Sequence, residues 1–340
     1  FGNVENEKNI RKFISSLTLG ALMVSLALSG GCGKNNDDEI YVAVIIKSKD
    51  QYWDATKKGA EDAGEEMDIR ITYEAPENED VDAQVKYVNN AIENKADAIV
   101  IAPVEDSDEL AAALKKAQSN NIHVIAIDSD IREEERTSCI STNNQNAGAI
   151  AARTASEILG GRGNVGIITH TPTSPTAIER KGGFETQIST YSDDSEENSI
   201  NIVAVENGDG LIEQSKEVAL KLIDENPDIE LIFTTNQGGT IGACMAIDEL
   251  DKADEIAVIG FDFFTNGKNF KNADEYIDSG VLDGVIVQNP YNMGYLGVRY
   301  ARNLVNGESI AASIDTGATL VTKDNIKDSD VQLIMNPMEN

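Results

Sequence analysis

The chain has 340 residues, which is enough for one large domain or two medium-sized domains with buried cores. Its 28 basic and 59 acidic side chains give a net charge of −31, which disfavours binding to the phosphates of a nucleic acid. Only two histidines and three cysteines are present, which disfavours histidine-based catalysis, structural zinc and a disulfide framework.

The beginning of the chain has the pattern of a secretory signal peptide. Lys8, Arg11 and Lys12 precede an uncharged stretch over 13–33 that is rich in Leu, Ile, Val, Ala and Ser. We therefore expect residues 1–31 to direct export and then to be removed. The alternative is an uncleaved membrane anchor, because about 20 uncharged residues are just long enough to span a bilayer.

Small residues lead directly into Cys32 at the end of this stretch. This arrangement resembles the lipobox of bacterial lipoproteins, although Ser29 stands where a Leu is usual. The resemblance implies that Cys32 carries lipid and anchors the protein to the outer face of a membrane, with 32–39 as a short tether. The other two cysteines, Cys139 and Cys244, are expected to be buried apolar residues.

From residue 41 onward, short runs of apolar and β-branched residues alternate with longer segments of helical periodicity. The predicted strands are 41–46, 69–73, 98–102, 124–127, 165–169, 200–205, 231–234, 256–261 and 285–288. The predicted helices are 52–66, 80–94, 107–119, 144–159, 177–190, 212–224, 239–250 and 291–305. Nearly continuous apolar strands such as 98–102 indicate burial on both faces, as in parallel sheets. The pattern predicts a doubly wound α/β protein.

These strands are too many for one ordinary open sheet, so two sheets in two lobes are expected. No segment rich in Pro, Gly and Ser divides the chain. The lobes should therefore be joined by several strand-like crossings. No internal sequence repeat is evident.

Signatures of the common α/β enzymes are missing from the sequence. The glycines of 161–166 match the dinucleotide pattern G-x-G-x-x-G, but they follow a predicted helix and lead into a strand, which is the reverse of the required context. Neither a phosphate-binding G-x-x-x-x-G-K-[ST] loop nor a G-x-S-x-G nucleophile motif occurs. We expect no cofactor, no metal and no enzymatic activity.

Polar and aromatic side chains follow the predicted strands instead, where open α/β sheets bind ligands. The first strand leads to Lys47, Tyr52 and Trp53, and aromatic faces such as these stack on sugar rings or cover a core. Later strand ends carry Asp128, Asn236, Asp262 and Gln288, and Arg180 lies near the start of a helix. This set contains no activated nucleophile. It suits a neutral small molecule rich in hydroxyl groups.

In their order and spacing, several segments together resemble bacterial sugar-binding proteins of the ribose/galactose type, the type 1 periplasmic binding proteins that serve ABC importers. The resemblance covers essentially all of 40–335, and it is carried by 41–60, Asp128, 138–144, 179–184, 233–236, 260–262 and 287–288.

The resemblance implies two Rossmann-like lobes, three crossings and a cleft that closes on the ligand. The lobes are expected to comprise 40–142 with 289–316 and 143–288 with 317–340, so that Thr142 and Gln288 lie at crossings. The residues implied to contact ligand are Tyr52, Trp53, Asp128, Thr142, Arg180, Asn236, Asp262, Gln288 and Lys47.

Three positions depart from the family pattern. Ala102 stands where the family has Asn before Pro, Ser129 replaces an Arg that often follows the strand-end Asp, and an aromatic residue usual in the second lobe aligns near Gly210. These changes remove donors and bulk. They favour a ligand that is larger or less polar than ribose.

We therefore expect an extracytoplasmic, monomeric lipoprotein that delivers a small sugar or polyol to an ABC permease and its ATPase. Lys47 with 128–130 also resembles receptors for the furanosyl autoinducer-2, so a receptor that feeds a sensor is the alternative. A related DNA-binding repressor would need an N-terminal DNA-reading domain where this chain has its signal segment.

Overall fold

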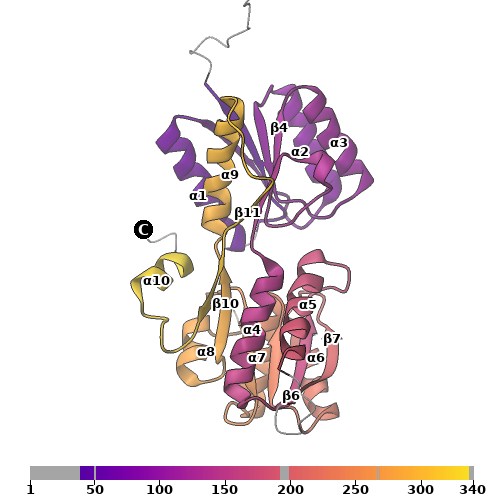
Figure 1. Cartoon of the computed structure of the whole chain (residues 1–340), viewed down its shortest axis with the longest axis vertical. Coiled ribbons are helices and arrows are strands. Elements are labelled where there is room, and N and C mark those ends of the chain that lie inside the picture. The colour runs from indigo at the N-terminus through magenta and orange to yellow at the C-terminus, as the bar shows by residue number, and fades with distance from the viewer. Residues whose placement is uncertain (1–38, 50, 192–198, 266, 268, 337–340) are drawn as a thin grey trace, which may run out of the picture. The chain divides into compact units, whose positions relative to one another are not determined.

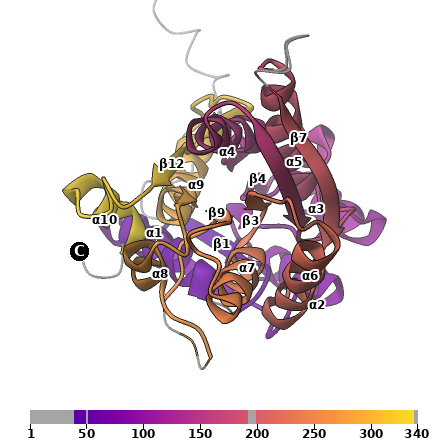
Figure 2. The same ribbon diagram turned by 90° about the horizontal axis from the view of Figure 1, so that it is seen from below.

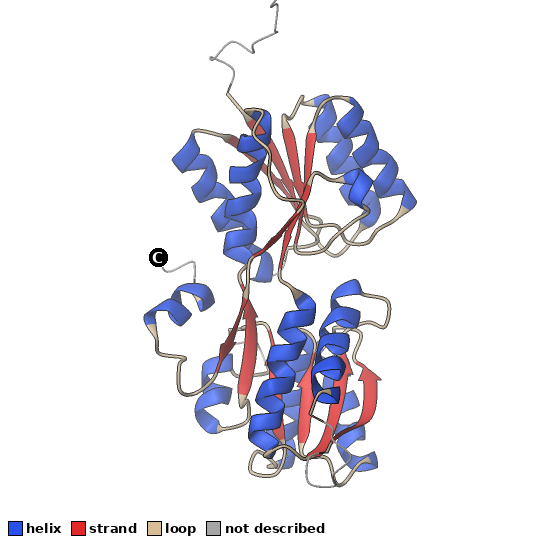
Figure 3. Ribbon diagram, viewed as in Figure 1, coloured by secondary structure: helices blue, strands red, loops and turns tan. Residues whose placement is uncertain are grey.

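Two sheets, each covered by helices on both faces, form the computed structural model of this chain (Figure 3). The structure describes residues 39–340 except 50, 192–198, 266, 268 and 337–340. The expected signal peptide 1–31, Cys32 and the tether up to residue 38 lie outside the described residues. Within the described part, none of the helices has the length and apolar character needed to cross a membrane.

The first sheet consists entirely of parallel strands and has the order β11-β5-β4-β3-β1-β2. Its strands are β1 (Tyr41–Ile45), β2 (Arg70–Glu74), β3 (Ala98–Ile101), β4 (His123–Ile127), β5 (Ser138–Ser141) and β11 (Ser313–Asp315). Alternate residues of β1 face opposite sides of the sheet, and both sides are buried. This explains why β1 reads as a continuous apolar run.

Helices cover both faces of this sheet (Figure 1). They are α1 (Gln51–Met67), α2 (Val81–Glu93), α3 (Asp108–Ser119) and α9 (Pro290–Val305), with a short 3₁₀ helix η1 (Glu133–Glu135). One hydrophobic cluster lies under α2 and α3, and another lies under α1 and α9. The carboxylate of Asp80 and the hydroxyl of Ser107 accept backbone N–H bonds at the starts of α2 and α3, which fixes where these helices begin.

The second sheet has the order β12-β10-β9-β8-β6-β7, with β12 antiparallel to β10 and the others parallel. Its strands are β6 (Gly163–Thr169), β7 (Ile200–Asn207), β8 (Leu231–Thr234), β9 (Ala257–Phe261), β10 (Gly284–Gln288) and β12 (Ala318–Val321). The helices around it are α4 (Asn144–Leu159), α5 (Pro175–Ser189), α6 (Ile212–Glu225), α7 (Gln237–Leu250), α8 (Ala273–Ser279) and α10 (Ser329–Met335). Figure 2 shows α4 and α5 on one face and α6, α7 and α8 on the other.

The two sheets have the same strand order, although the sequence shows no repeat and the edge strands differ in direction, with β11 parallel to β5 and β12 antiparallel to β10. Replacing β1 to β5 by β6 to β10 reproduces the strand order. The chain passes between the sheets after β5, after β10 and between β11 and β12. We call each sheet with its helices a lobe. The predicted doubly wound, two-lobed α/β fold is confirmed.

In each lobe, one pair of helices packs at backbone-to-backbone distance because glycines lack a Cβ. A Cβ on Gly59 of α1 would lie 2.0 Å from the carbonyl oxygen of Tyr291, and one on Gly294 of α9 would lie 2.0 Å from that of Thr56. The second lobe repeats this arrangement with α4 and α5.

On α4, a Cβ on Gly148 would lie 2.0 Å from the carbonyl oxygen of Arg180, and on α5 one on Gly183 would lie 2.0 Å from that of Gln145. α1 corresponds to α5, because each follows the first strand of its lobe, and α9 corresponds to α4. With the helices matched in this way, Thr56 of α1 is equivalent to Arg180 of α5. Four residues earlier in each helix, Tyr52 is then equivalent to Thr176.

Candidate ligand-binding site

The carboxylates expected at two strand ends occupy equivalent turns in the two lobes. Asp128 follows β4 and Asp262 follows β9, with φ of 65° and 66°. This left-handed conformation is more readily adopted by Asp than by most other residues. Their backbone N–H groups donate to the carbonyl oxygens of Ile140 at 3.0 Å and Ile286 at 2.8 Å. The fold therefore presents one buried carboxylate from each lobe, with 9% and 8% exposure.

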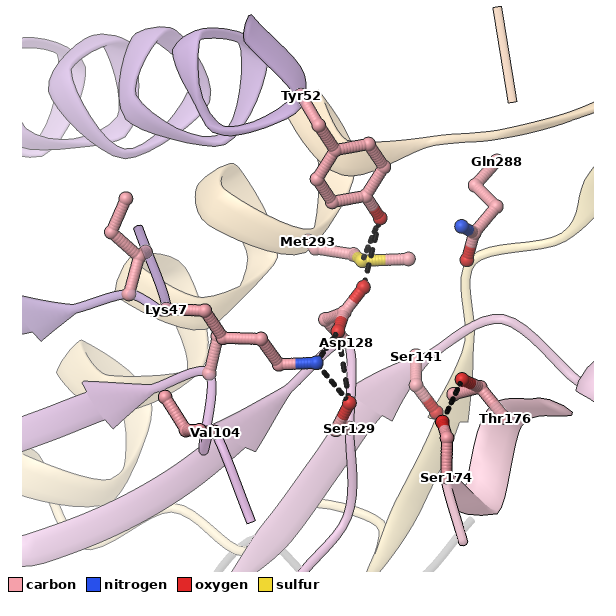
Figure 4. A network of polar contacts seen from close by, with 12 residues as sticks. Lys47, Tyr52, Val104, Asp128, Ser129, Ser141, Ser174, Thr176, Gln288 and Met293 are labelled. Carbon is pink, nitrogen blue, oxygen red and sulfur yellow. Dashed lines mark hydrogen bonds and ion pairs between the residues drawn. The ribbon is translucent and has the colours of Figure 1, made fainter. Parts of the chain in front are cut away.

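Asp128 is held by three donors of its own lobe (Figure 4). The Lys47 ammonium donates to Asp128 Oδ2 at 2.8 Å and to Ser129 Oγ at 2.6 Å. The Tyr52 hydroxyl donates to Asp128 Oδ1 at 2.9 Å, and Ser129 Oγ donates to Oδ2 at 3.0 Å. Lys47, Tyr52 and Asp128 are therefore brought together as one polar group.

Charge and burial set the protonation states of this group. Burial alone would raise the pKa of Asp128, but the charge and hydrogen bond of Lys47, together with the Tyr52 hydroxyl, lower the pKa below its usual value. Burial and the neighbouring negative charges of Asp128 and Asp262 raise the pKa of Tyr52 well above its usual value. Asp128 is thus ionised at neutral pH and Tyr52 remains a donor.

The second-lobe carboxylate has an amide partner. Gln288 is the last residue of β10, and its Nε2 donates to Asp262 Oδ1 at 2.8 Å. Thr142 follows β5, and its hydroxyl donates to the carbonyl oxygen of Gly317 at 3.5 Å. Ile140 and Ile286 pair equivalently with the Asp residues, so Thr142 and Gln288 occupy equivalent positions two residues further on. Both lie where the chain passes between lobes.

Arg180 and Asn236 bond mainly to their own lobe. Arg180 Nε donates to Asn144 Oδ1 at 2.9 Å, its Nη1 donates to the carbonyl oxygen of Thr235 at 2.8 Å, and the guanidinium carbon lies 3.8 Å from the centre of the Phe261 ring. Asn236 is the N-cap of α7, where its Oδ1 accepts from the Gly239 backbone at 3.0 Å. Both side chains thus also have structural partners.

Trp53 lies in the apolar cluster of the first lobe, with 5% exposure. Its ring meets Tyr52 edge to face, with ring centres 4.9 Å apart, and Lys47 Nζ lies 5.9 Å from its centre. Tyr52 lines a cavity of about 240 Å³, whereas Trp53 lies in the apolar core next to Tyr52. The stacking role of Trp53 stays a prediction.

Two cavities are each lined by residues of both lobes. One of about 240 Å³ is lined by Tyr52, Asp262 and Gln288, with Phe263 and Phe264 supplying apolar surface. The other, of about 270 Å³, is lined by Asp128, Ser129 and Thr142 together with Thr176 of α5. The expected residues Tyr52, Asp128, Thr142, Asp262 and Gln288 therefore reach hollow parts of the molecule. Both volumes lie just below the range of about 300–1,000 Å³ that is typical of ligand pockets.

His170 belongs to the same region and was not expected from the sequence. It follows β6 directly, and its Nδ1 lies 2.9 Å from Thr235 Oγ1. Its Nε2 lies 2.9 Å from Ser174 Oγ and 3.1 Å from Thr176 Oγ1. Burial, and then the positive charges of Arg180 and Lys47, lower the pKa of His170 to about 3, so the imidazole is neutral. The strand-end rule that identifies Asp128 would also have identified His170, because 165–169 is a predicted strand.

Gln84 is a second unexpected residue, and it bonds to the backbone next to the site. This fully buried side chain on α2 donates through Nε2 to the carbonyl oxygens of Ile46 at 3.2 Å and Ala102 at 2.7 Å. Its Oε1 accepts from the Val104 backbone at 2.9 Å. Gln84 thereby fixes the segment that ends in Lys47. An amide on the apolar face of a predicted helix was the available signal.

Among the predicted site residues, the positive charges of Lys47 and Arg180 are offset by Asp128 and Asp262, and the imidazole of His170 is uncharged. The two cavities are also lined by the carboxylates of Asp54, Asp130, Glu179 and Asp315. Across the part of the chain that the structure describes, no cluster of three or more His, Cys, Asp or Glu side chains is arranged to hold a metal ion. The arrangement is suited to binding an uncharged polar molecule, and it defines a two-lobed α/β ligand-binding protein.

Comparison with known proteins identifies the family. The family model described as periplasmic binding protein domain matches residues 40–309, and the chain belongs to this family. The ribose import binding protein of Escherichia coli is 24% identical, over 90% of this chain and 98% of that protein. The xylitol-binding protein of Mycolicibacterium smegmatis is 22% identical, over 90% of this chain and 84% of that protein.

Solved structures agree with this assignment. A carbohydrate transporter solute-binding protein from Agrobacterium radiobacter, in complex with D-arabinose, has a TM-score of 0.76 and 31% identity, and the match covers 88% of this chain and 100% of that one. A solute-binding protein from Agrobacterium vitis, bound to α-D-tagatopyranose, has a TM-score of 0.78 and 26% identity, over 87% and 99% of the two chains. This chain is therefore an extracytoplasmic substrate-binding protein and not an enzyme, as expected.

Proposed function

We propose that this protein captures a small neutral sugar or polyol and presents it to an ABC importer. The observation that carries the proposal is the pair of buried carboxylates, Asp128 and Asp262, which the two lobes present from equivalent turns. Carboxylates accept hydrogen bonds from hydroxyl groups, and the equal numbers of positive and negative charges among Lys47, Arg180, Asp128 and Asp262 favour a ligand without net charge. The relatives named for ribose, xylitol and D-arabinose support the same class of ligand.

In this proposal, Asp128 and Asp262 accept from ligand hydroxyl groups, while Gln288 and Thr142 add bonds at the crossings. Lys47, Arg180 and Asn236 complete the polar set, and Tyr52 and Trp53 provide the aromatic surface. Bonds to charged groups contribute about 1.5–3 kcal/mol each. A few such bonds, less the cost of ordering, give about −8 kcal/mol, which corresponds to micromolar affinity.

Capture is proposed to close the lobes. We assign 40–142 with 289–316 to the first lobe and 143–288 with 317–340 to the second. A ligand that bonds to both Asp128 and Asp262 stabilises a closed form over an open one, and this shift in population is what a permease recognises. We further propose that lipid on Cys32 anchors a monomer at the membrane, where it meets the permease and the ATPase.

Calorimetry with a panel of neutral sugars and polyols tests the proposal. The panel contains D-ribose, D-arabinose, xylitol, D-fucose and D-tagatose. We expect micromolar binding of at least one member by the wild type and a 10- to 100-fold loss in Asp128→Asn, which removes a charged acceptor. Asp248→Asn is the matched control because it removes an exposed carboxylate paired with Lys271, and its affinity should be unchanged. Absence of binding to every panel member would refute the proposal.

The same assay decides the role of Trp53. Trp53→Phe retains an aromatic ring, whereas Trp53→Ala removes it, so stacking predicts a large loss only in the alanine variant. Equal affinity of Trp53→Ala and wild type would assign Trp53 to the core alone.

A further inference from the structure

The cavity of about 240 Å³ has a wall that the residues proposed to bind ligand do not form. Beside Tyr52, Asp262 and Gln288, its lining is largely apolar and comes from three separate parts of the chain. These parts are the segment after β9, the end of β10 with the start of α9, and α10. Their apolar lining residues are Phe263, Phe264, Val287, Pro290, Ile334 and Met335. We call this space the apolar cavity.

The other cavity, of about 270 Å³, occupies the equivalent place in the fold. Ile140 and Ile286 are equivalent through their bonds to the two strand-end Asp residues. Three residues further on, Asn143 and Asn289 are the N-caps of α4 and α9, and each side chain accepts a backbone N–H of its helix at 3.0 Å. The glycine contacts match α1 to α5 in the same way. Lining residues of the two cavities that lie on these elements can therefore be matched one by one.

At matched positions, one cavity is polar where the other is apolar. Ser129 and Asp130 line the cavity of about 270 Å³, whereas Phe263 and Phe264 line the apolar cavity at the equivalent positions after the strand-end Asp. The other pairs of this kind are Ser141 with Val287, Asn144 with Pro290, and Glu179 with Ala55. In each pair the polar side chain is on one side and the apolar side chain is on the other.

The matched lining residues that are polar in both cavities belong almost entirely to the proposed ligand contacts. They are Asp128 with Asp262, Thr142 with Gln288, and Thr176 with Tyr52. The apolar cavity therefore adjoins groups that bind hydroxyls, but the rest of its lining offers a different chemistry.

The aromatic part of this lining is held in place. The ring of Phe264 has 2% exposure, and its centre lies 6.2 Å from that of Phe270 and 6.3 Å from that of Tyr276. Gln237 Nε2 donates to the carbonyl oxygen of Phe263 at 2.8 Å, which fixes the backbone of the same segment. These contacts preorganise the wall for binding.

α10 supplies the rest of the wall and lies on the side of the molecule where α1 begins (Figures 1 and 2). Val331 and Met335 of this helix are buried in the second-lobe core, and Ile334 packs against it. Leu333 points elsewhere, with 52% exposure, and does not line the cavity. In the described part of the chain, the first lobe has no counterpart of α10, because the chain passes from β11 directly to β12.

The remaining polar lining residues leave the wall apolar. Gln237 is bonded to the segment after β9, and Asn336 Nδ2 donates to Gln332 Oε1 at 3.0 Å. Asp54 and Thr265 are exposed to solvent. A ligand group that enters between the phenylalanines and α10 therefore meets mainly apolar surface.

We propose that the apolar cavity binds a non-polar group carried by the sugar, so that the preferred ligand is a deoxy sugar or a glycoside with an alkyl or aryl group. Burying a methyl or aryl group against this wall is favourable, whereas a hydroxyl group placed there would lose its bonds to water without replacement. This proposal rests on the proposed capture of a neutral sugar or polyol, and it names the chemical class of that ligand.

Sugars that share one pyranose ring and differ only in the group on C5 test this preference by calorimetry. Each set carries hydrogen, CH₃ or CH₂OH at that position. The sets are L-arabinose, D-fucose and D-galactose; D-xylose, 6-deoxy-D-glucose and D-glucose; and D-ribose, 6-deoxy-D-allose and D-allose. A second arm compares D-galactose and D-glucose with their methyl and phenyl β-glycosides, which separates a deoxy sugar from a glycoside as the source of the apolar group.

We expect the wild type to bind an apolar member of at least one set about fourfold or more tightly than the counterparts with hydrogen or a hydroxyl group, the gain for one buried carbon. Phe263→Ser introduces the side chain that the first lobe has at the matched position, and Ile334→Ser places a hydroxyl group on the α10 side. Both residues are only partly buried. Each variant should lose the preference for the apolar member while its affinity for the hydrogen counterpart changes less than about twofold.

Leu333→Ser is the matched control, because it changes an apolar residue of the same helix outside the cavity. It should retain the wild-type preference, and melting curves confirm that each variant is folded under the conditions of the assay.

Three results would count against the proposal in different ways. If the wild type binds a sugar or polyol of either panel but binds no apolar member more tightly, the apolar subsite is overturned while the proposed function stands. If the preference exists but persists in both Phe263→Ser and Ile334→Ser, its assignment to this cavity is wrong. Failure of the wild type to bind any sugar or polyol would overturn the proposed function together with the subsite.

Discussion

The neutral imidazole of His170 predicts a loss of stability in mild acid. Its pKa is lowered from 6.5 to about 3 in the folded protein, first by burial and then by Arg180 and Lys47. Between these two values the unfolded chain binds a proton that the folded chain does not bind. The free energy of unfolding therefore falls as the pH decreases below 6.5, by about 1.4 kcal/mol per pH unit. At pH 4.5, two units below 6.5, the contribution is about 3 kcal/mol.

Urea unfolding of the wild type and of His170→Gln at pH 7.0 and 4.5 measures the contribution of His170 to the free energy of unfolding. Glutamine takes up no proton, so the decrease in the free energy of unfolding between the two pH values should be about 3 kcal/mol smaller in the variant. Carboxylates with raised pKa, such as Asp283 and Asp274, titrate in both proteins and cancel in the difference. His123→Asn should change the pH dependence of the free energy of unfolding less than His170→Gln does. Burial also lowers the pKa of His123, but this side chain is only partly buried.

Nuclear magnetic resonance provides a direct check, because the sequence contains only two histidines. We expect the imidazole resonance that disappears in His170→Gln to stay at its neutral position from pH 8 to pH 4.5. Titration of this resonance near pH 6.5, or identical pH profiles for the wild type and His170→Gln, would refute the assignment of a buried neutral imidazole.

Two further predictions concern the packing beneath the site. Gly148→Val should lower the melting temperature and weaken sugar binding, because its Cβ would lie 2.0 Å from the Arg180 carbonyl oxygen and overpacking costs about 1–3 kcal/mol. The control is Gly182→Ala on the adjacent helix, which should be neutral or stabilising because no atom lies within 4 Å of its Cβ. Equal melting temperatures of the two variants would contradict the reasoning. Gln84→Met keeps the side-chain length but leaves the Val104 N–H and two carbonyl oxygens without their partner, so unfolding in urea should show a loss of about 1–3 kcal/mol, and stability equal to wild type would show that the three bonds contribute nothing.

The fold could be predicted from the sequence to the extent that its elements carry a strong apolar pattern. The predicted strands 41–46, 98–102 and 231–234 are buried on both faces, and such strands stand out as apolar runs. β5, β11 and β12 were not predicted as strands. β5 has the sequence Ser-Cys-Ile-Ser and β11 has Ser-Ile-Asp, and these strands form because a neighbouring strand offers its backbone groups. Their stability comes from tertiary pairing, which a local pattern does not contain.

For the site, too, the sequence predicts which residues take part but not the contacts that they make. Asp128, Asp262 and Gln288 could be found because topology alone brings strand ends to one edge of a sheet. The hydrogen bonds among them could not be found in this way, since the contact between Tyr52 and Asp128 joins residues 76 positions apart. His170 satisfies the same rule, although the scarcity of histidine in the sequence disfavours histidine-based catalysis. Scarcity excludes a catalytic array, and it leaves open a single neutral imidazole that forms hydrogen bonds.

The equivalence of the lobes also indicates how a ligand would be read. The N–H groups of Ala102 and Thr235 donate to the carbonyl oxygens of Ile45 and Ile168, so Lys47 and the neutral His170, two residues further on, occupy equivalent positions in the two lobes. Each lobe also has an Asp after its fourth strand, Asp128 after β4 and Asp262 after β9. The first lobe therefore offers Asp128 already paired with an ammonium group, and the second offers Asp262 paired with the Gln288 amide. A ligand hydroxyl group meets charged partners on either side, because the second lobe also contains the buried guanidinium group of Arg180, and bonds to charged groups are the stronger ones. Both lobes should thus contribute to affinity.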